Sequence, residues 1–274
     1  MNRSLNALVG IGLMMVSTLL TASQSEAGLS AIDIIEKAEQ AAYYAGDNGR
    51  SKARMMIVDS QGRKQMRQFT IFRQDRTDAS GLESGDQDML VFFSRPSEVK
   101  GMVFRVEKYS DLNTDDNRWL YLPALDLVKR IAAGDKRTSF VGSHFFYEDV
   151  SGRSIEEDTF AIVEETPTHY VLKAVPKYVQ TVEFAYYIVS IDKRTFVPTT
   201  IDFFNENDAN YRRVEALAVE AIQGFHTVVR SKVSDLVTGG YTLMEFRGVE
   251  YNLTLPSDLF TERSLRVPPR ALLN

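Results

Sequence analysis

The 274-residue sequence contains no cysteine. Disulfide bonds, thiolate catalysis and cysteine-ligated metal sites are therefore excluded, and stability has to come from the burial of side chains. Positive charge is not in excess either, since 32 Lys and Arg residues stand against 37 Asp and Glu residues, a net charge of -5. A chain without a basic excess lacks the electrostatic footprint of nucleic-acid binding. Nucleic acid is not expected as a partner.

Recognisable catalytic and cofactor motifs are also missing. There is no P-loop and no GxGxxG sequence, so nucleotide cofactors have no binding motif. The three histidines, His144, His169 and His226, are not spaced like metal ligands. Ser143 precedes His144, but adjacent side chains rarely point at each other and the GxSxG turn is absent. We therefore expect no cofactor, no bound metal and no enzymatic activity.

The first 27 residues have the pattern of a secretory signal. Arg3 precedes an apolar run from Leu5 to Leu20, and Ser25-Glu26-Ala27 offers small residues at a cleavage point. A retained membrane anchor is the alternative, although the run is shorter than the ~20 residues that a spanning helix needs. We expect residues 1–27 to be a signal peptide, residues 28–274 to form a single domain, and the mature protein to lie in the periplasm.

Hydrophobic periodicity predicts one helix followed by many strands. Ser30 and Asp33 form a helix-capping pattern, and apolar residues recur at helical spacing as far as Ala45. From Lys52 to Tyr251, short apolar or alternating runs are separated by turn residues. No second long helical pattern interrupts them, so a parallel α/β fold is not expected. The fold class is α+β, built mainly from a large antiparallel sheet, sandwich or barrel.

Residues 119–153 concentrate aromatic side chains in a segment with few regular elements. A hairpin pattern, WLYLPALDLVKRI, leads into a loop with Gly and Ser. Its aromatic residues need an apolar surface, because exposure to water forfeits roughly 1.5 to 3 kcal/mol each. The loop is either a lid over a cleft or an ordinary plug of the core, and both interpretations stay open. The charged residues 135–137 and 156–158 are interpreted as surface groups. The aromatic residues are Phe140, Phe145, Phe146 and Tyr147.

Two stretches of the sequence resemble a known family. The run WLYLPAL..VKRI followed by GDKRTSFVGSHFFYEDVSGR, together with the upstream FFSRPSEVKGMVF, is similar to the LolA-like outer-membrane lipoprotein-sorting protein family. The resemblance extends over residues 30–270. It implies an unclosed, curved β-barrel of about eleven antiparallel strands, with helices or a lid plugging the concave face. It also implies an apolar cleft for acyl chains.

The resemblance implies a carrier that shields acyl chains of a lipid or lipoprotein during transport across the envelope. Its partners would be an inner-membrane exporter of the resistance-nodulation-division (RND) type and an outer-membrane acceptor. The cargo stays open among a lipoprotein, a phospholipid and a hopanoid-like lipid. The alternatives are a docking subunit that carries nothing, and a lipid hydrolase. The hydrolase would need Ser143 and His144 within hydrogen-bonding reach of each other or of an acid.

For a carrier, strand residues of one parity are expected to line the cleft. In the lid, the aromatic residues would refill the cleft when the cargo leaves, and Gly134 and Gly142 would act as hinges. The predicted lining residues are Phe69, Ile71, Phe104, Leu120, Leu122, Phe184 and Tyr186.

Overall fold

Thirteen antiparallel strands form one sheet in the structure, a computed structural model that describes residues 28–268 and 270–273. The predicted signal peptide, residues 1–27, lies outside the described residues. The sheet order is β6-β5-β4-β3-β2-β1-β13-β12-β11-β10-β9-β8-β7, so β6 and β7 are its two edges. The strands are β1 (Asn48–Val58), β2 (Lys64–Thr77), β3 (Glu83–Arg95), β4 (Val103–Lys108), β5 (Asn117–Leu122), β6 (Leu127–Ile131), β7 (Asp158–Glu165), β8 (His169–Pro176), β9 (Tyr186–Asp192), β10 (Pro198–Phe204), β11 (Asn210–Ile222), β12 (Phe225–Asp235) and β13 (Tyr241–Tyr251).

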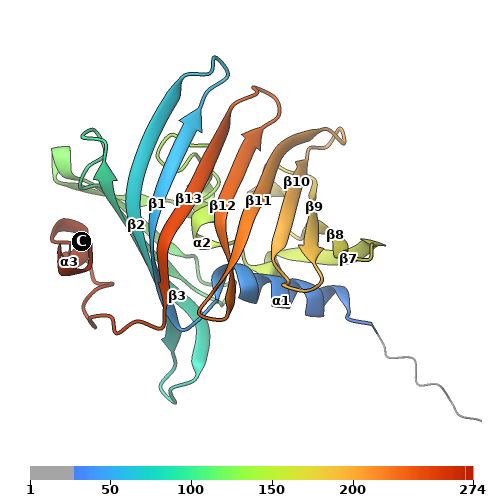
Figure 1. Ribbon diagram of the computed structural model, residues 1–274, viewed down its shortest axis with the longest axis horizontal. Helices are drawn as coiled ribbons and strands as arrows, with labels where there is room; N and C mark the ends of the chain where they lie inside the picture. Colours follow the sequence, from blue (N-terminus) through green and yellow to red (C-terminus); the bar gives the residue numbers. More distant parts are fainter. Residues whose placement is uncertain (1–27, 269, 274) are drawn as a thin grey trace, which may run out of the picture.

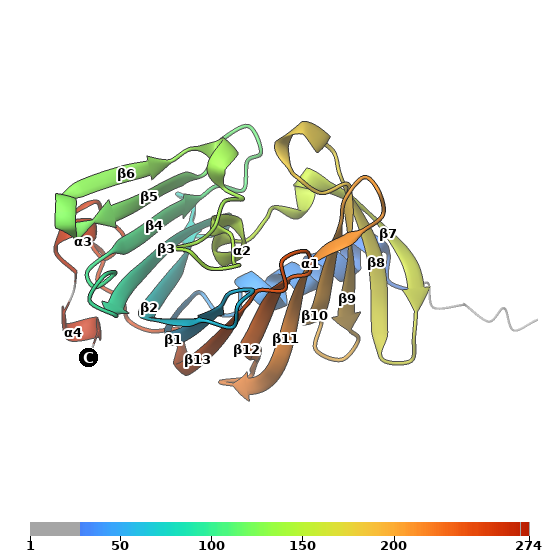
Figure 2. The same cartoon turned by 90° about the horizontal axis from the view of Figure 1, so that it is seen from above.

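The sheet curves into an open half-barrel whose two edges do not meet (Figures 1 and 2). Helices α1 and α2 lie on its concave side, and α3 and α4 lie on its convex side (Figure 2). The predicted unclosed, mainly antiparallel barrel is confirmed, with thirteen strands instead of about eleven. No helix in the described ranges is long and apolar enough to span a membrane. The α-helices are α1 (Ala31–Tyr43), α2 (Tyr147–Ser151), α3 (Arg263–Arg266) and α4 (Arg270–Leu273), and the 3-10 helices are η1 (Pro123–Leu125), η2 (Ala133–Asp135), η3 (Ile155–Glu157) and η4 (Val179–Thr181).

Helix α1 is fixed at both ends by side chains. The hydroxyl of Ser30 accepts a hydrogen bond from the Asp33 N–H at 3.2 Å, and the Asp33 carboxylate accepts one from the Ser30 N–H at 2.9 Å. This is the predicted capping pattern. At the other end, the Arg73 guanidinium donates to the carbonyls of Tyr43, Ala45 and Gly46 at 2.6 to 2.7 Å. Arg73 thereby binds carbonyls that the end of a helix leaves without partners.

The concave face carries two separate apolar clusters. One lies under the loop that follows β6 and includes Phe69, Phe104 and Phe140. The other lies under α1, where Ile34 and Leu172 are fully buried. The two halves of the sheet are therefore covered by different segments of the chain.

The convex face of β2 to β4 carries a third apolar cluster. Side chains alternate along a strand, so Met89 and Val91 face the concave side while Leu90 and Phe92 face outward. The outward residues are covered by the C-terminal segment, in which α3 contributes Leu265. The apolar run of β3 is thus buried on both faces.

We expect Leu265→Ala to lower the free energy of unfolding by about 2 to 5 kcal/mol, because the side chain is almost completely buried and its removal leaves a cavity. Urea denaturation measures this change. Leu82→Ala is the matched control, because Leu82 is 68% exposed. Equal effects of the two substitutions would show that α3 does not stabilise the sheet.

Candidate functional site

An apolar pocket lies between α1, the concave face of the sheet and the loop that follows β6. Its volume is about 350 Å³, within the range of small-molecule sites. The last turn of α1 contributes only small residues and Tyr43. The apolar lining from the strands and the loop consists of Phe69, Ile71, Met89, Phe145, Val150, Pro198, Ile201, Phe203, Val214, Ala216, Val228, Met244, Phe246 and Val249.

We call residues 132–153 the lid. Phe140, at its tip, is fully buried, and its ring lies 5.5 Å from the rings of Phe104 and Tyr147 and 6.2 Å from that of Phe69. Tyr147 is also buried, while Phe145 is buried and lines the pocket. The apolar side of the lid therefore closes the pocket and at the same time completes the core.

A tight turn at residues 140–143 forms the tip of the lid. The Ser143 N–H donates to the Phe140 carbonyl at 3.0 Å. Val141 and Gly142 both have positive φ, 49° and 78°. Positive φ is unfavourable for a β-branched residue such as valine, so the turn is strained there. Gly134 lies in η2 and is not at positive φ, so this conformation requires glycine at Gly142 and not at Gly134.

The other side of the lid contacts the far half of the sheet, strands β7 to β11. These contacts are made between arginine guanidinium groups and aromatic rings. Phe146 lies between two guanidinium groups, 5.1 Å from that of Arg137 and 4.3 Å from that of Arg212. The Arg137 guanidinium also lies 4.8 Å from the ring of Phe184 and 5.3 Å from that of Phe203. Such contacts are strongest when the cation is removed from water, and the side chains of Arg137 and Arg212 are 7% and 4% exposed.

Glu148 is the centre of a buried ionic network that joins the lid to its surroundings. Its carboxylate lies 2.6 Å from Arg137, 3.0 Å from Lys136 and 3.4 Å from Arg153. Arg137 makes a second, bidentate pair with Glu183, just before β9, at 2.6 and 2.7 Å. Burial alone would raise the pKa of Glu148, but the three cations outweigh it and lower the pKa to about 2.

The network continues at the start of β7 and in β11. Arg153 pairs with the fully buried carboxylate of Asp158, which also accepts a hydrogen bond from the Tyr187 hydroxyl at 2.9 Å. Arg212 pairs with Asp149 of the lid. The prediction that residues 135–137 and 156–158 are surface charges is wrong for Lys136, Arg137 and Asp158, because residues distant in sequence supply their partners and bury them.

Ser143 and His144 do not form a catalytic pair. The Ser143 hydroxyl bonds the backbone of Phe145, accepting from its N–H at 3.1 Å. The His144 ring and backbone N–H both contact the Thr242 hydroxyl of β13, at 2.8 and 3.0 Å. These contacts give both residues a structural role. Within the described ranges, no group of His, Asp and Glu residues has the geometry of a metal site.

The predicted lining residues fall into three places. Phe69 and Ile71 line the pocket. Phe104 and Leu120 are buried beneath the lid, with Leu122 packed against the same cluster. Phe184 contacts Phe203 and Tyr187, while Tyr186 stacks on Phe204 and bonds Asp208 with its hydroxyl.

Tyr186 does not line the pocket, and the inward aromatic residue of β9 is Tyr187. The prediction placed Phe184 and Tyr186 on one face because they are two residues apart. Strand β9 begins only at Tyr186, so the alternation of side chains does not extend back to Phe184. In the register of β9 and β10, Tyr187 is opposite Phe203, which lines the pocket.

The predicted lining residues did not include those that β10, β11, β12 and β13 contribute to the pocket. Met244 and Phe246 belong to an alternating strand pattern that marks them as one apolar face, and this signal was available. Ala41 of α1 and Ala45 just after it belong to the predicted helical pattern, but that pattern does not show that they line a pocket. Their roles depend on which segments fold against each other.

We expect Glu148→Gln to lower the free energy of unfolding at neutral pH by about 3 to 5 kcal/mol, because the buried cations lose their shared anion. The folded-state pKa of Glu148, about 2, lies below its usual value of 4.5. Its contribution is therefore fully present above pH 4.5 and is lost as the pH falls toward 2. Chemical denaturation at several pH values measures the free energy of unfolding of the unmodified protein and of the Glu148→Gln variant. The difference between these two values should become smaller as the pH is lowered.

The matched control is Glu262→Gln, since the Glu262 side chain is 79% exposed. A Glu148→Gln protein as stable as this control at neutral pH would contradict a stabilising role for the network.

Comparisons with known proteins agree on the fold. A structure of a DUF1329 family protein from Desulfovibrio piger is similar over 86% of this chain and 95% of that chain, with a TM-score of 0.76 and 24% identity. A putative outer membrane lipoprotein-sorting protein domain from Vibrio parahaemolyticus matches over 86% and 98%, with a TM-score of 0.75 and 21% identity. A LolA superfamily protein from Nitrosomonas europaea matches over 86% and 99%, with a TM-score of 0.65 and 13% identity.

A search of curated proteins found no match. A family model described as "Uncharacterized protein" matches residues 85–267, more than half of the chain. This match covers the lid, the ionic network and most of the sheet. The chain therefore belongs to the family that this model describes, and it has the LolA-like fold that these three structures share.

Proposed function

We propose that this protein is a periplasmic carrier that shields acyl chains of a lipid or lipoprotein in the pocket beneath α1 and the lid. The observation that carries the proposal is the apolar pocket itself, which is lined from seven strands, a helix end and the lid. The pocket adjoins no catalytic pair, because Ser143 and His144 are bound to Phe145 and Thr242. The LolA-like fold supports the same role.

The energetics of such a carrier require a lid that responds to the cargo. Each buried CH₂ group is worth about 0.8 kcal/mol, so a chain of ~14 carbons would gain on the order of 10 kcal/mol before entropic costs. Release at a useful rate then requires an empty state that is also well packed. Phe145 lies at the boundary between pocket and core and can contact either the cargo or the core. The lid would thus be a core plug when the cargo is absent.

The two sides of the lid suit this exchange because they differ in chemistry. The apolar contacts of Phe140, Phe145 and Tyr147 can be replaced by acyl groups of similar polarity. The ion pairs of Glu148 and Arg137 have no such substitute, and breaking them would leave buried charges unpaired. In our proposal the turn at Gly142 moves while the segment from Glu148 onward stays attached to β7 and β11 through Arg153 and Asp149.

Transport across the envelope would need a donor and an acceptor of the cargo. An inner-membrane exporter of the RND type and an outer-membrane acceptor are the partners that we propose. The secretory pattern of residues 1–27 supports the periplasmic location.

The pocket can be blocked without disturbing the core. We expect Ala216→Trp to weaken binding of a fluorescent fatty acid by more than about tenfold, because an indole in the pocket excludes at least two CH₂ groups worth about 0.8 kcal/mol each. Fluorescence titration measures the affinity. Leu217→Trp is the control, because Leu217 is the exposed neighbour and does not line the pocket.

If Ala216→Trp and Leu217→Trp bound the fatty acid with equal affinity, the ligand would have to bind outside this pocket. No binding by the unmodified protein would favour a docking subunit that carries nothing.

Movement of the lid can be tested with an engineered disulfide, since the native chain has no cysteine. The side chains of His144 and Thr242 are in contact, so His144→Cys with Thr242→Cys would tie the lid to β13. We expect the oxidised form to take up and release fatty acid more slowly than the reduced form in stopped-flow measurements. The reduced form of the same protein is the control. Identical rates in the two forms would contradict a moving lid.

A further inference from the structure

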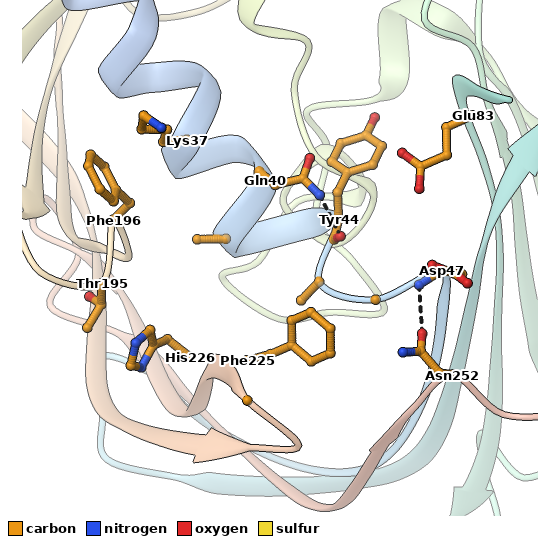
Figure 3. A pocket seen from close by; sticks show the side chains of 14 residues that line it. Lys37, Gln40, Tyr44, Asp47, Glu83, Thr195, Phe196, Phe225, His226 and Asn252 are labelled. Atoms are coloured by element: carbon orange, nitrogen blue, oxygen red, sulfur yellow. Dashed lines mark hydrogen bonds between the residues drawn. The ribbon is translucent and has the colours of Figure 1, made fainter. Parts of the chain in front are cut away.

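A second pocket, which we call the polar pocket because Lys37, Asp47 and Glu83 line it, lies at the end of α1, next to the acyl pocket. Its volume is about 470 Å³, and it is lined by α1, the turn before β10, the hairpin between β11 and β12, and Asn252 after β13 (Figure 3). Ala41 and Ala45 line both pockets. On the other side, Phe225 of the polar pocket packs on Tyr251 of the acyl pocket, with ring centroids 4.9 Å apart. The polar pocket therefore adjoins the acyl pocket at the end away from the lid.

Opposite charges occupy opposite walls of the polar pocket. Lys37 lies on one wall with Thr195, Phe196 and His226, and its ammonium group is 5.5 Å from the centre of the Phe196 ring (Figure 3). Asp47 and Glu83 lie on the facing wall with Asn252 (Figure 3).

The acidic wall is held in place by hydrogen bonds from its neighbours. The backbone N–H of Asp47 donates to the Asn252 side-chain oxygen at 2.9 Å, and the Tyr44 hydroxyl donates to the Gly85 carbonyl at 3.0 Å. Gln40 is anchored through a hydrogen bond to the Tyr44 carbonyl at 2.9 Å. Asp47 and the end of α1 are thus fixed by hydrogen bonds beside a space that stays open to water.

A charged group at this position fits the exit of an acyl pocket. A lipid whose chain lies in the apolar pocket keeps its head in water, because desolvating a charge is costly. Between the two walls, a phosphate would face Lys37 and His226 while an amine or ammonium group would face Asp47 and Glu83. Aromatic rings such as Phe196 and Phe225 also attract ammonium groups. A lipid head with a single charge could form ionic contacts with only one of the two walls.

We infer that the polar pocket binds the zwitterionic head of a phospholipid, such as phosphoethanolamine or phosphocholine. The inference rests on the proposed carrier function, since it orients a lipid whose chains occupy the acyl pocket. It narrows the cargo from acylated molecules in general to phospholipids of zero net charge. The head would lie at the end of α1, and the chain ends would point toward Phe145 of the lid.

The test compares three short-chain lipids with identical acyl chains in competition with a fluorescent fatty acid: a phosphatidylcholine, a phosphatidylglycerol and a neutral diacylglycerol. The unmodified protein should bind phosphatidylcholine most tightly. Lys37→Glu should weaken phosphatidylcholine binding about two- to fivefold, the effect of one hydrated ion pair, and leave diacylglycerol binding unchanged. Glu83→Lys should weaken phosphatidylcholine binding and strengthen phosphatidylglycerol binding.

Lys64→Glu is the matched control, because Lys64 is exposed at the start of β2, the opposite end of that strand from the polar pocket. Circular dichroism checks that each variant is folded. Binding of all three lipids with equal affinity, or equal effects of Lys37→Glu and Lys64→Glu, would overturn the inference while leaving the carrier proposal intact. Failure of the unmodified protein to bind any of the lipids or the fatty acid would overturn both.

Discussion

An open sheet with an apolar concave face has to be covered, and this requirement shapes the rest of the molecule. The two edges of the thirteen-stranded sheet do not pair, so no strand closes the barrel over its own interior. Exposing that face to water would cost about 25 cal/mol for each Å² of apolar surface. Helix α1 covers one half and the lid covers the other. The apolar pocket is the part of the concave face that neither segment fills.

The lid joins the two halves of the half-barrel by two kinds of contact. Phe140, Phe145 and Tyr147 pack on β1 to β5, where Phe140 lies among other rings. Its charged residues pair with residues at or near β7, β9 and β11, through Arg153, Arg137 and Asp149. Apolar packing tolerates exchange with an apolar ligand, whereas a buried ion pair cannot be separated without a large desolvation cost. In the proposed carrier, a cargo that enters beneath the lid would therefore compete with the aromatic contacts and not with the ionic ones.

Local patterns in the sequence predicted the parts of this arrangement that local physics determines. The Ser30 and Asp33 cap, the strand alternation and the need to bury the lid aromatics all follow from residues close together in the chain. The ionic network does not, since Arg137 and Glu183, or Asp149 and Arg212, are brought together only by the finished fold. Surface and buried charges look alike in sequence, which is why Lys136, Arg137 and Asp158 were misplaced. The prediction for Tyr186 was wrong for a related reason. Side chains alternate between the two faces only within a strand, and the sequence did not show that β9 begins at Tyr186.

The central claim is that the pocket beneath α1 and the lid carries acyl chains. Native mass spectrometry of the protein purified from the cells that naturally produce it, followed by lipid extraction, tests it most directly. The account predicts a bound species that carries acyl chains and that is lost in the Ala216→Trp variant. A protein that is consistently free of lipid, and that stays free after incubation with acylated ligands, would contradict it.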